Sequence, residues 1–445
     1  MRSLLLPIAA LLSSSSLAAP PADLGYELVE GLTTEVGQRL AGTEAEARAR
    51  AWAVSRLRSL GFANVRIEPF DMPVWVRGAE TAEVIAPFPQ KLVLAALGNS
   101  GATPEAGLTA EVVGFPSLDA LKAAPDARVR GKIVFVWHRM TATQDGSSYG
   151  YFGAVRRSGP SVASKKGALA ILIRSIGTDH HRVPHTGVQT WSDGAQPIPA
   201  AALSVPDADQ LERILSRGKP VTIHLVLTPR MTGTHQSGNV IAEVPGRDAG
   251  AGVVLIGGHL DSWDLGTGAI DDAAGIAITT AAAKRILDGS KPKRTIRLVW
   301  FGAEEPGGFG GDAYARAHDR EKHALTAEAD FGGDRVWSFR ASLADPKGAL
   351  TAELTNVLGG FGVGPGAGAA HGGTDIGPMV QRGTPVIDLE QDGTRYFDIH
   401  HTADDTLDKI DRAQLNQAID AWSAMLRVVA DTDDPLTPLP PREGH

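Results

Sequence analysis

The chain has 445 residues and no cysteine; 43% of its residues are hydrophobic, 21% are charged, and its formal net charge is −8. This length allows two domains or one elaborated domain, and the composition is that of a globular protein rather than a disordered or fibrous one. An acidic chain without a Lys/Arg cluster is unsuited to nucleic acid or anionic membranes, and a chain without cysteine forms neither disulfides nor thiolate metal sites.

The first predicted element is a secretory signal peptide over residues 1–19. This segment has an early Arg2, a short apolar stretch and small residues at its end, with a cleavage site after Ala18. An uncleaved membrane anchor is the alternative, but the apolar stretch is shorter than the ~20 residues of a membrane span. We therefore expect a periplasmic or secreted protein without a membrane partner.

Residues 20–100 and 231–432 have the pattern of an α/β domain. A helix is predicted over 42–60, with Thr43 as its N-cap, followed by a short strand over 65–70. Strands and helices then alternate from residue 238 onward. The predicted strands are 253–258, 295–302, 324–330 and 386–390, and the predicted helices are 273–289 and 312–318. Such alternation predicts a mostly parallel central sheet flanked by helices.

Residues 101–230 have a different pattern, in which short β-type runs alternate with Gly and Pro turns. The simplest interpretation is a β-rich insertion that splits the α/β domain into two segments. Residues 433–445 are rich in proline and acidic residues, which is typical of a mobile tail.

Five polar clusters accompany the apolar runs in the last third of the chain. They are His259 with Asp261, Asp271 with Asp272, Glu304 with Glu305, Asp330 alone, and His400 with His401. Three of these clusters directly follow predicted strands. Because ligands bind at the carboxyl ends of parallel strands, we expect the clusters to converge there.

Each cluster taken alone also has an ordinary structural interpretation. His259 could close a strand turn, Asp271 and Asp272 could cap the next helix, and the remaining clusters could lie in solvated loops. Together, however, two adjacent carboxylate pairs at one sheet edge would repel each other strongly unless divalent cations were bound. Imidazole and carboxylate ligands without sulfur favour Zn²⁺, with Co²⁺ or Mn²⁺ as substitutes.

Five segments carry a resemblance to one enzyme family through their order and spacing. They are GGHLDSWD, GAIDDAAG, WFGAEEPG, the lone Asp330 and YFDIHHTADDT. They resemble the dizinc exopeptidases, the family of zinc aminopeptidases and glutamate carboxypeptidases, and are most similar to its carboxypeptidase Q-like peptidases. The resemblance implies a zinc-exopeptidase (phosphorylase/hydrolase-like) fold with residues 101–230 as an inserted protease-associated domain.

The resemblance also implies the activity and the partner. We expect an exopeptidase that hydrolyses peptide bonds at a chain end or in dipeptides, as an aminopeptidase, a carboxypeptidase or a dipeptidase. A peptide is the expected partner, with a homodimer as a further option.

Carried over residue by residue, the resemblance implies two zinc ions. His259 and Asp330 would hold one ion, Glu305 and His401 the other, and Asp271 would bridge them. Two cations about 3.5–4 Å apart need a shared carboxylate, and together they lower the pKa of a water held between them.

The resemblance further implies roles for three neighbouring residues. Glu304 would be the general base that takes the proton of the water and passes it to the leaving amine. Asp261 would hydrogen-bond the second imidazole nitrogen of His259 and fix its tautomer. His400 would polarise the substrate carbonyl or stabilise the oxyanion.

Three further residues are candidates for substrate binding. Trp263 could form a wall of the pocket, although a buried aromatic packed on the sheet is an equal alternative. His371 and Asp375 lie in the glycine-rich segment 359–375 and could line the pocket, or belong to an ordinary loop. His180, His181 and His185 in the insertion are predicted to be ordinary surface residues, with a second metal site as the alternative.

Two other functions are compatible with parts of this pattern. A glutaminyl cyclase-like enzyme would use one zinc ion and lack the insertion, so the complete two-metal set and the β-rich block argue against it. A non-catalytic receptor-like homologue would have lost metal ligands, whereas all five ligand positions and the base are competent here.

Overall fold

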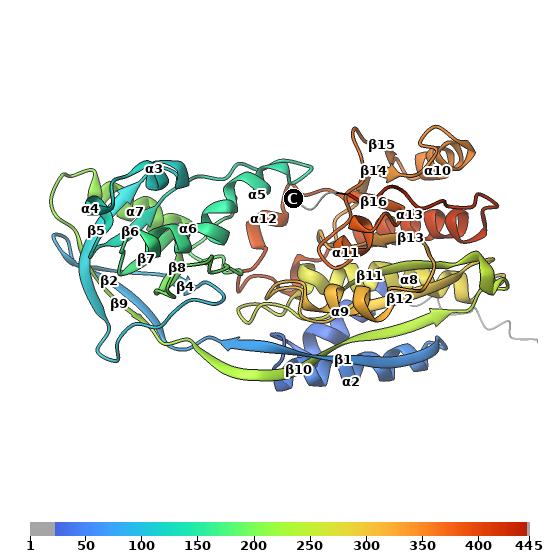
Figure 1. Cartoon of the computed structure of the whole chain (residues 1–445), viewed down its shortest axis with the longest axis horizontal. Coiled ribbons are helices and arrows are strands. Elements are labelled where there is room, and N and C mark those ends of the chain that lie inside the picture. The colour runs from blue at the N-terminus through green and yellow to red at the C-terminus, as the bar shows by residue number, and fades with distance from the viewer. Residues whose placement is uncertain (1–22, 443–445) are drawn as a thin grey trace, which may run out of the picture.

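The computed structural model describes residues 23–442, so the predicted signal peptide lies outside the described residues. Two eight-stranded sheets form two lobes of the molecule (Figure 1). The long antiparallel strands β1 (Ala63–Val76) and β10 (Arg230–Val244) run from one lobe toward the other. The second lobe is inserted in the chain between these two strands.

The first sheet has the strand order β1-β10-β12-β11-β13-β16-β14-β15. Its parallel centre consists of β11 (Val253–His259), β12 (Thr295–Phe301), β13 (His323–Glu328) and β16 (Val386–Gln391). The outer strands are β14 (Val336–Ser342), which is antiparallel to β16, and β15 (Gly364–Pro365). The predicted parallel core is therefore present, and the antiparallel pairs are confined to its flanks.

Helices cover both faces of this sheet, which explains why its central strands are apolar on both sides. In β11, Val254 and Ile256 pack into the cluster that includes α8 (Ala274–Leu287) and α13 (Arg412–Asp431). Leu255 points to the other face, toward α9 (Phe309–Ala317) and α11 (Gly377–Gln381).

The predicted helices over 42–60, 273–289 and 312–318 correspond to α2 (Glu44–Ser59), α8 and α9. Thr43 caps α2 as predicted, because its side chain accepts a hydrogen bond from the Glu46 N–H. The remaining helices of this lobe are α1 (Leu24–Gly31), α10 (Ala349–Gly359) and α12 (Tyr396–Ile399). Within residues 23–442, no helix combines the length and apolar character needed to cross a bilayer.

The second sheet has the order β3-β2-β9-β5-β6-β7-β8-β4. Its first strands precede residue 101, which was the predicted start of the insertion. Its strands are β2 (Glu80–Ala86), β3 (Gln90–Leu92), β4 (Leu94–Ala96), β5 (Leu108–Phe115), β6 (Ile133–Val136), β7 (Ala170–Arg174), β8 (Ala200–Leu203) and β9 (Thr222–Leu227). The boundary was misplaced because β2 and β4 pair with the distant strands β9 and β8.

The insertion is itself α/β rather than simply β-rich. Its helices are α3 (Leu118–Ala123), α4 (Asp126–Val129), α5 (Ser147–Phe152), α6 (Ala154–Lys165) and α7 (Val205–Leu215). Most of them are short, and α6 contains Gly159 and Pro160, two residue types that argue against a helix when only the sequence is read.

The described part of the C-terminal tail is packed against the first lobe instead of being free. Leu436 is buried. The Leu439 N–H donates to the Gly383 carbonyl at 2.8 Å, and the Arg442 N–H donates to the Gln381 carbonyl at 2.9 Å. The prediction of a mobile tail is therefore wrong for residues 433–442.

A buried polar network fastens α9 to the sheet. Arg297 of β12 donates to the Tyr314 hydroxyl of α9 at 3.1 Å and to Glu321 at 2.9 Å. His323 directs Nδ1 at the Glu321 carbonyl, at 3.2 Å, so Nδ1 carries the hydrogen and Nε2 accepts from the Tyr314 hydroxyl at 2.8 Å. Burial lowers the pKa of His323 from 6.5 to about 4, and the imidazole is neutral.

We expect this network to make the fold sensitive to acid. Between pH 6.5 and about 4 the unfolded chain binds a proton that folded His323 does not, so the free energy of unfolding should fall as the pH falls through this range. The full contribution is about 3 kcal/mol. His323→Gln should flatten the curve of stability against pH, measured by urea unfolding between pH 7 and pH 4. Equal slopes for wild type and variant would contradict this account, and His235→Gln, at an exposed site of β10, is the matched control.

Candidate metal centre

The carboxyl ends of the parallel strands bring the predicted clusters together. His259 is the last residue of β11, Glu304 and Glu305 follow β12, and Asp330 follows β13. Ala303 adopts a positive φ of 59° and turns the chain just before the two glutamates. Such left-handed residues are uncommon outside glycine and cluster at functional sites.

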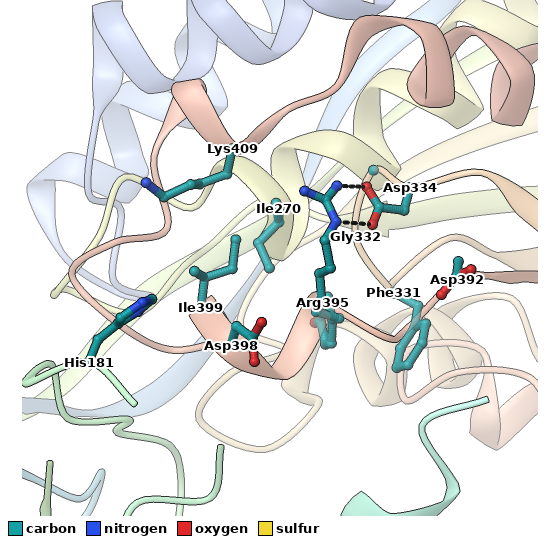
Figure 2. Close-up of a pocket in the computed structure, with 12 residues that line it drawn as sticks. His181, Ile270, Phe331, Gly332, Asp334, Asp392, Arg395, Asp398, Ile399 and Lys409 are labelled. Atoms are coloured by element: carbon teal, nitrogen blue, oxygen red, sulfur yellow. Dashed lines mark hydrogen bonds and ion pairs between the residues drawn. The ribbon is translucent and has the colours of Figure 1, made fainter. Parts of the chain in front are cut away.

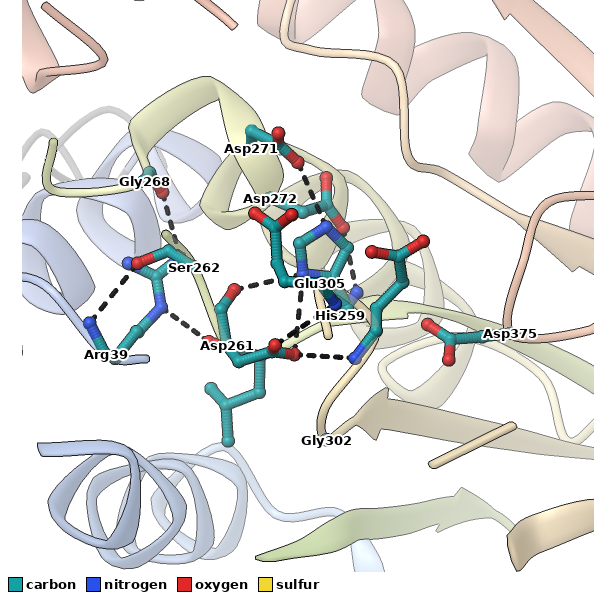
Figure 3. A network of polar contacts seen from close by, with 12 residues as sticks. Arg39, His259, Asp261, Ser262, Gly268, Asp271, Asp272, Gly302, Glu305 and Asp375 are labelled. Atoms are coloured by element: carbon teal, nitrogen blue, oxygen red, sulfur yellow. Dashed lines mark hydrogen bonds and ion pairs between the residues drawn. The ribbon is translucent and has the colours of Figure 1, made fainter. Parts of the chain in front are cut away.

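Asp271 belongs to both groups of potential metal ligands, and Figure 3 shows its contact with His259. Its Oδ1 atom is 3.0 Å from His259 Nε2, and its Oδ2 atom is 3.2 Å from His401 Nε2. His259 Nε2 is also 3.3 Å from Asp330 Oδ1, and His401 Nε2 is 3.1 Å from Glu305 Oε2. The five predicted ligand residues thus form two sets that share Asp271.

The spacing of these atoms fits metal coordination. Two ligand atoms bound to a tetrahedral zinc at about 2.0–2.1 Å lie roughly 3.3 Å apart. Ligand atoms of His259, Asp271 and Asp330 all lie within 4.8 Å of one another, as do those of Asp271, His400 and His401. Asp271 Oδ2 is buried and has no hydrogen-bond partner among the described residues.

The imidazoles of His259 and His401 are also oriented as metal ligands would be. His259 Nδ1 lies 3.0 Å from the Asp261 carbonyl, and His401 Nδ1 lies 3.3 Å from the Thr186 carbonyl. A carbonyl only accepts, so Nδ1 of neutral His259 carries the hydrogen and its Nε2 is the ligand atom. His401 Nδ1 also lies 3.3 Å from Arg156 Nη1, which only donates, and the Nε2 atom of His401 faces Asp271.

The electrostatics of the cluster call for cations. Burial raises the pKa of Glu305 to about 8 and that of Asp330 to about 6. Burial also opposes charge on His259, but Asp330 and Asp271 outweigh it and hold the pKa of that imidazole well above its ordinary value. Glu305 and Asp271 raise the pKa of His401 in the same way, against its burial. Divalent ions bound here would compete with protons for these groups.

Asp261 supports the site in a different way from the one predicted. Its Oδ1 atom lies 3.7 Å from His259 Nδ1, too far for a hydrogen bond, and the imidazole bonds to the Asp261 carbonyl instead. The carboxylate accepts from the N–H groups of Glu304 and Glu305 at 3.0 and 3.2 Å (Figure 3). Asp261 thus holds the glutamate turn, and burial raises its pKa to about 7.

The sequence left open whether Asp271 and Asp272 cap a helix or face a metal ion, and the structure gives each residue one of these roles. The Asp272 carboxylate accepts from the N–H groups of Gly275 at 3.0 Å and His259 at 2.9 Å, so it caps α8 and ties it to β11. A Cβ atom on Gly258 would lie 2.3 Å from Asp272 Oδ2 and 2.8 Å from the Ala329 carbonyl oxygen, so a larger residue here would displace this carboxylate or the backbone. Asp271 alone faces the metal centre.

Two residues that position Asp271 were not identified from the sequence. Asp405 accepts from the N–H groups of Ala269 at 2.8 Å and Ile270 at 2.7 Å, and Arg39 donates to the carbonyl of Gly268 at 2.9 Å. Together they hold the turn that leads into Asp271. Asp405 lies within the motif HHTADDT, which could have indicated it, whereas Arg39 belongs to no motif.

A cavity of about 370 Å³, called the main cavity below, opens onto the metal centre. Its lining includes the candidate ligands Asp271, Glu305, Asp330 and His401, together with Tyr149, Arg156, Arg157, Val188, Glu304, Gly307, Phe331, Thr374, Tyr396, Phe397 and His400. The Glu304 carboxylate forms no hydrogen bond or ion pair with any described residue. It is therefore free to interact with a ligand.

The three predicted substrate-binding residues lie outside this lining. Trp263 is buried and packs edge-on against Trp75 and His401, which corresponds to the structural alternative. His371 is exposed, and its backbone N–H donates to the Asp388 carboxylate at 2.7 Å. Asp375 is buried, its carboxylate oxygens have no hydrogen-bond partner among the described residues, and burial raises its pKa well above the ordinary value. The sequence indicated that these residues lie near the site, but it did not indicate that their side chains point away from the main cavity.

His400 lines the main cavity beside His401. The two rings stack with centroids 3.5 Å apart, and His400 Nε2 is 3.5 Å from Asp271 Oδ2. Burial and the neighbouring His401 lower the pKa of His400 well below its ordinary value. Both imidazoles reach Asp271, whereas the contact with Glu305 is made by His401.

His185 of the insertion is buried, not a surface residue as predicted. Its ring bridges the Asp179 carboxylate at 2.8 Å and the His400 carbonyl at 2.7 Å. The Thr186 N–H also donates to the His401 carbonyl at 3.0 Å. The insertion therefore supports the backbone that carries both histidines, while His180 and His181 are exposed.

Comparison with known proteins assigns the chain to a family. Residues 239–426 match peptidase family M28. Carboxypeptidase Q of Mus musculus is 36% identical over 414 residues, which cover 92% of this chain and 86% of that protein.

Solved structures share the fold over nearly the whole chain. A peptidase M28 precursor from Shewanella amazonensis SB2B has a TM-score of 0.92 at 46% identity, covering 95% of this chain and 96% of its own. A zinc aminopeptidase from Bacillus subtilis has a TM-score of 0.67 at 19% identity over 94% of this chain and 97% of its own, a likeness of fold alone. The chain belongs to peptidase family M28 and is a metallopeptidase.

Proposed function

We propose that the chain is a two-zinc exopeptidase that hydrolyses peptide bonds at a chain end or in dipeptides. The observation that carries this proposal is Asp271, whose two oxygens face two separate sets of candidate ligands. His259 and Asp330 would hold one ion with it, and Glu305 and His401 the other. When bound, the ions polarise the scissile carbonyl and acidify water.

The other side chains at the cavity would handle protons and orientation. Glu304 has a free carboxylate at the cavity wall, so it would accept a proton from water and return it to the leaving amine. Asp261 positions Glu304 through the backbone. His400 is neutral and borders the cavity, which suits a hydrogen-bond donor to the substrate carbonyl oxygen.

Two further features belong to the same proposal. The signal-like segment 1–19 supports export of the chain to the periplasm or the medium. The second lobe would be the protease-associated type of insertion, and its contacts with the backbone of His400 and His401 support a role in forming the site.

Removal of metal tests the proposal. Dialysis against a chelator should reduce peptide hydrolysis to background, and Zn²⁺ or Co²⁺ should restore it. The metal-free protein should also melt at a lower temperature, because ions that bind only the folded chain stabilise it. Elemental analysis should find two ions per active chain. Full activity in a sample shown to be metal-free would refute the proposal.

A further inference from the structure

Residues 396–401, called the histidine segment below, are anchored within the first lobe just before their start and just after their end. Before α12, the Arg395 guanidinium donates to the Asp334 carboxylate through Nη2 at 2.6 Å and Nε at 3.1 Å (Figure 2). After the segment, the Asp405 carboxylate accepts from the N–H groups of the turn that leads into Asp271. The histidine segment therefore spans the distance between two fixed points of its own lobe.

Between these two points, the histidine segment is held by the insertion. The Thr178 N–H donates to the Phe397 carbonyl at 3.1 Å, and the Thr178 hydroxyl donates to Asp398 Oδ1 at 2.7 Å. Asp398 also borders a cavity of about 270 Å³ that is lined in part by His181 of the insertion (Figure 2). The insertion thus lies directly against the helix α12.

The contacts with the insertion continue along both histidines. His185 Nδ1 lies 2.7 Å from the His400 carbonyl, and because a carbonyl only accepts, the imidazole donates this hydrogen bond. The Thr186 N–H donates to the His401 carbonyl at 3.0 Å. Three carbonyls and one carboxylate of the histidine segment therefore have their partners in residues 178–186, called the docking segment below.

The backbone conformation of His401 makes this support necessary. Its φ of 62° lies in the left-handed region, which residues other than glycine rarely adopt and which persists only where the surrounding structure holds it. Thr186 is fully buried and is itself held in place. Arg77 Nη2 donates to the Thr186 hydroxyl at 3.1 Å and to Asp264 Oδ1 at 2.8 Å. Because Arg77 lies where the chain passes from β1 to β2, its guanidinium joins the docking segment to the first lobe.

The other set of candidate ligands makes no comparable contact. His259 is the last residue of β11, and its Nδ1 lies 3.0 Å from the Asp261 carbonyl. Next to Asp330, the Ala329 N–H donates to the Gly257 carbonyl at 2.9 Å. Within residues 23–442, no hydrogen bond joins His259 or Asp330 to the insertion. The two ligand sets thus differ in whether the insertion supports them.

We propose that the insertion controls one of the two metal positions. The docking segment holds His401 in place, so the ion of Glu305 and His401 depends on the insertion, whereas the ion of His259 and Asp330 does not. This inference rests on the proposed function, from which it takes the two ions. The docking segment acts through the backbone of His401, in the way that outer-shell partners orient metal ligands. Displacement of the insertion from the first lobe would then release one ion and leave the other.

Two amide substitutions of His185 test the inference. Asparagine places its amide nitrogen near the position of Nδ1, and glutamine near that of Nε2. His185→Gln should therefore lose the donor to the His400 carbonyl and bind the dependent ion about 10- to 100-fold more weakly, the usual effect of removing an outer-shell partner. His185→Asn should keep most of the affinity, and His180→Gln, at an exposed neighbour, should match wild type. Zn²⁺ is titrated into the metal-free protein in competition with a chromophoric chelator.

Two backgrounds assign the effect to one ion. Asp330→Asn retains the position of Glu305 and His401, so adding His185→Gln should weaken the remaining zinc site. Glu305→Gln retains the position of His259 and Asp330, where the same addition should leave the affinity unchanged. A selective loss in the first background supports the inference. An equal loss in both backgrounds would show general destabilisation and overturn it.

A second variant leaves the buried imidazole of His185 intact. Thr178→Val removes the hydroxyl that binds half-buried Asp398 and should weaken the same ion by about 5-fold, the effect of one hydrogen bond. Unchanged zinc affinity in both Thr178→Val and His185→Gln overturns the inference. These titrations require no turnover. Selective weakening in a zinc-loaded protein that hydrolyses no peptide would refute the proposed function and leave this inference standing.

Discussion

Replacing Glu304 with glutamine should lower kcat by about 10²- to 10⁴-fold, the usual contribution of a general base. The Glu304 carboxylate lies at the wall of the main cavity and has no partner among the described residues. Glutamine has the same shape, and its backbone N–H would still donate to Asp261, so the turn after β12 should be kept. The expected loss is thus one of proton transfer and not of folding.

The neighbouring residue provides the matched control. Glu305 lies 3.1 Å from His401 Nε2 and is a candidate ligand. Glu305→Gln should lose bound metal, whereas Glu304→Gln should keep two ions per chain by elemental analysis and an unchanged circular dichroism spectrum. Near-normal kcat in a fully metal-loaded Glu304→Gln variant would exclude Glu304 as the base.

Substitution of Asp271 should have the second large effect. Its two oxygens serve both sets of ligands, so Asp271→Asn should weaken both metal sites at once. We expect the loss of metal affinity to exceed the ~100-fold cost of removing an outer-shell partner, with hydrolysis falling to background at limiting zinc.

Asp330→Asn is the comparison for this variant. Asp330 contacts His259 in one ligand set, so the set of Glu305 and His401 should remain. Metal titration followed by elemental analysis should therefore find about one ion in Asp330→Asn and fewer in Asp271→Asn. Retention of two tightly bound ions by Asp271→Asn would rule out a bridging carboxylate.

Local sequence patterns were sufficient to predict the centre of the first lobe, but not α10, α13 or β14. The helix α8 and the strands β11 and β12 agree with their predicted ranges to within two residues at each end. Their apolar runs, caps and glycine stops act over a few neighbouring residues, and so are visible in the sequence. The start of the second lobe was not predictable in this way. β2 pairs locally with β3, but β2 and β4 join the second sheet through strands more than 100 residues away.

Three of the five polar clusters could be placed for a topological reason. Once β11, β12 and β13 are parallel neighbours, the residues that follow them must meet at one edge. The direction of individual side chains was not predictable. The sequence suggested that the carboxylate of Asp261 faces His259, whereas the carbonyl does, and it placed His371 at a pocket from which the fold turns it away.

The sequence by itself therefore determined the α/β core and the sheet edge at which the polar clusters meet, because these follow from periodicity and strand direction, whereas the assignment of the five candidate ligands came from the family resemblance. The tertiary structure alone decided which groups complete the site. Arg157, Tyr149 and His185 come from an insertion whose docking depends on contacts between residues far apart in the chain, such as His185 with the His400 carbonyl. No local pattern encodes such a contact, since it depends on the shapes of two separately folded surfaces.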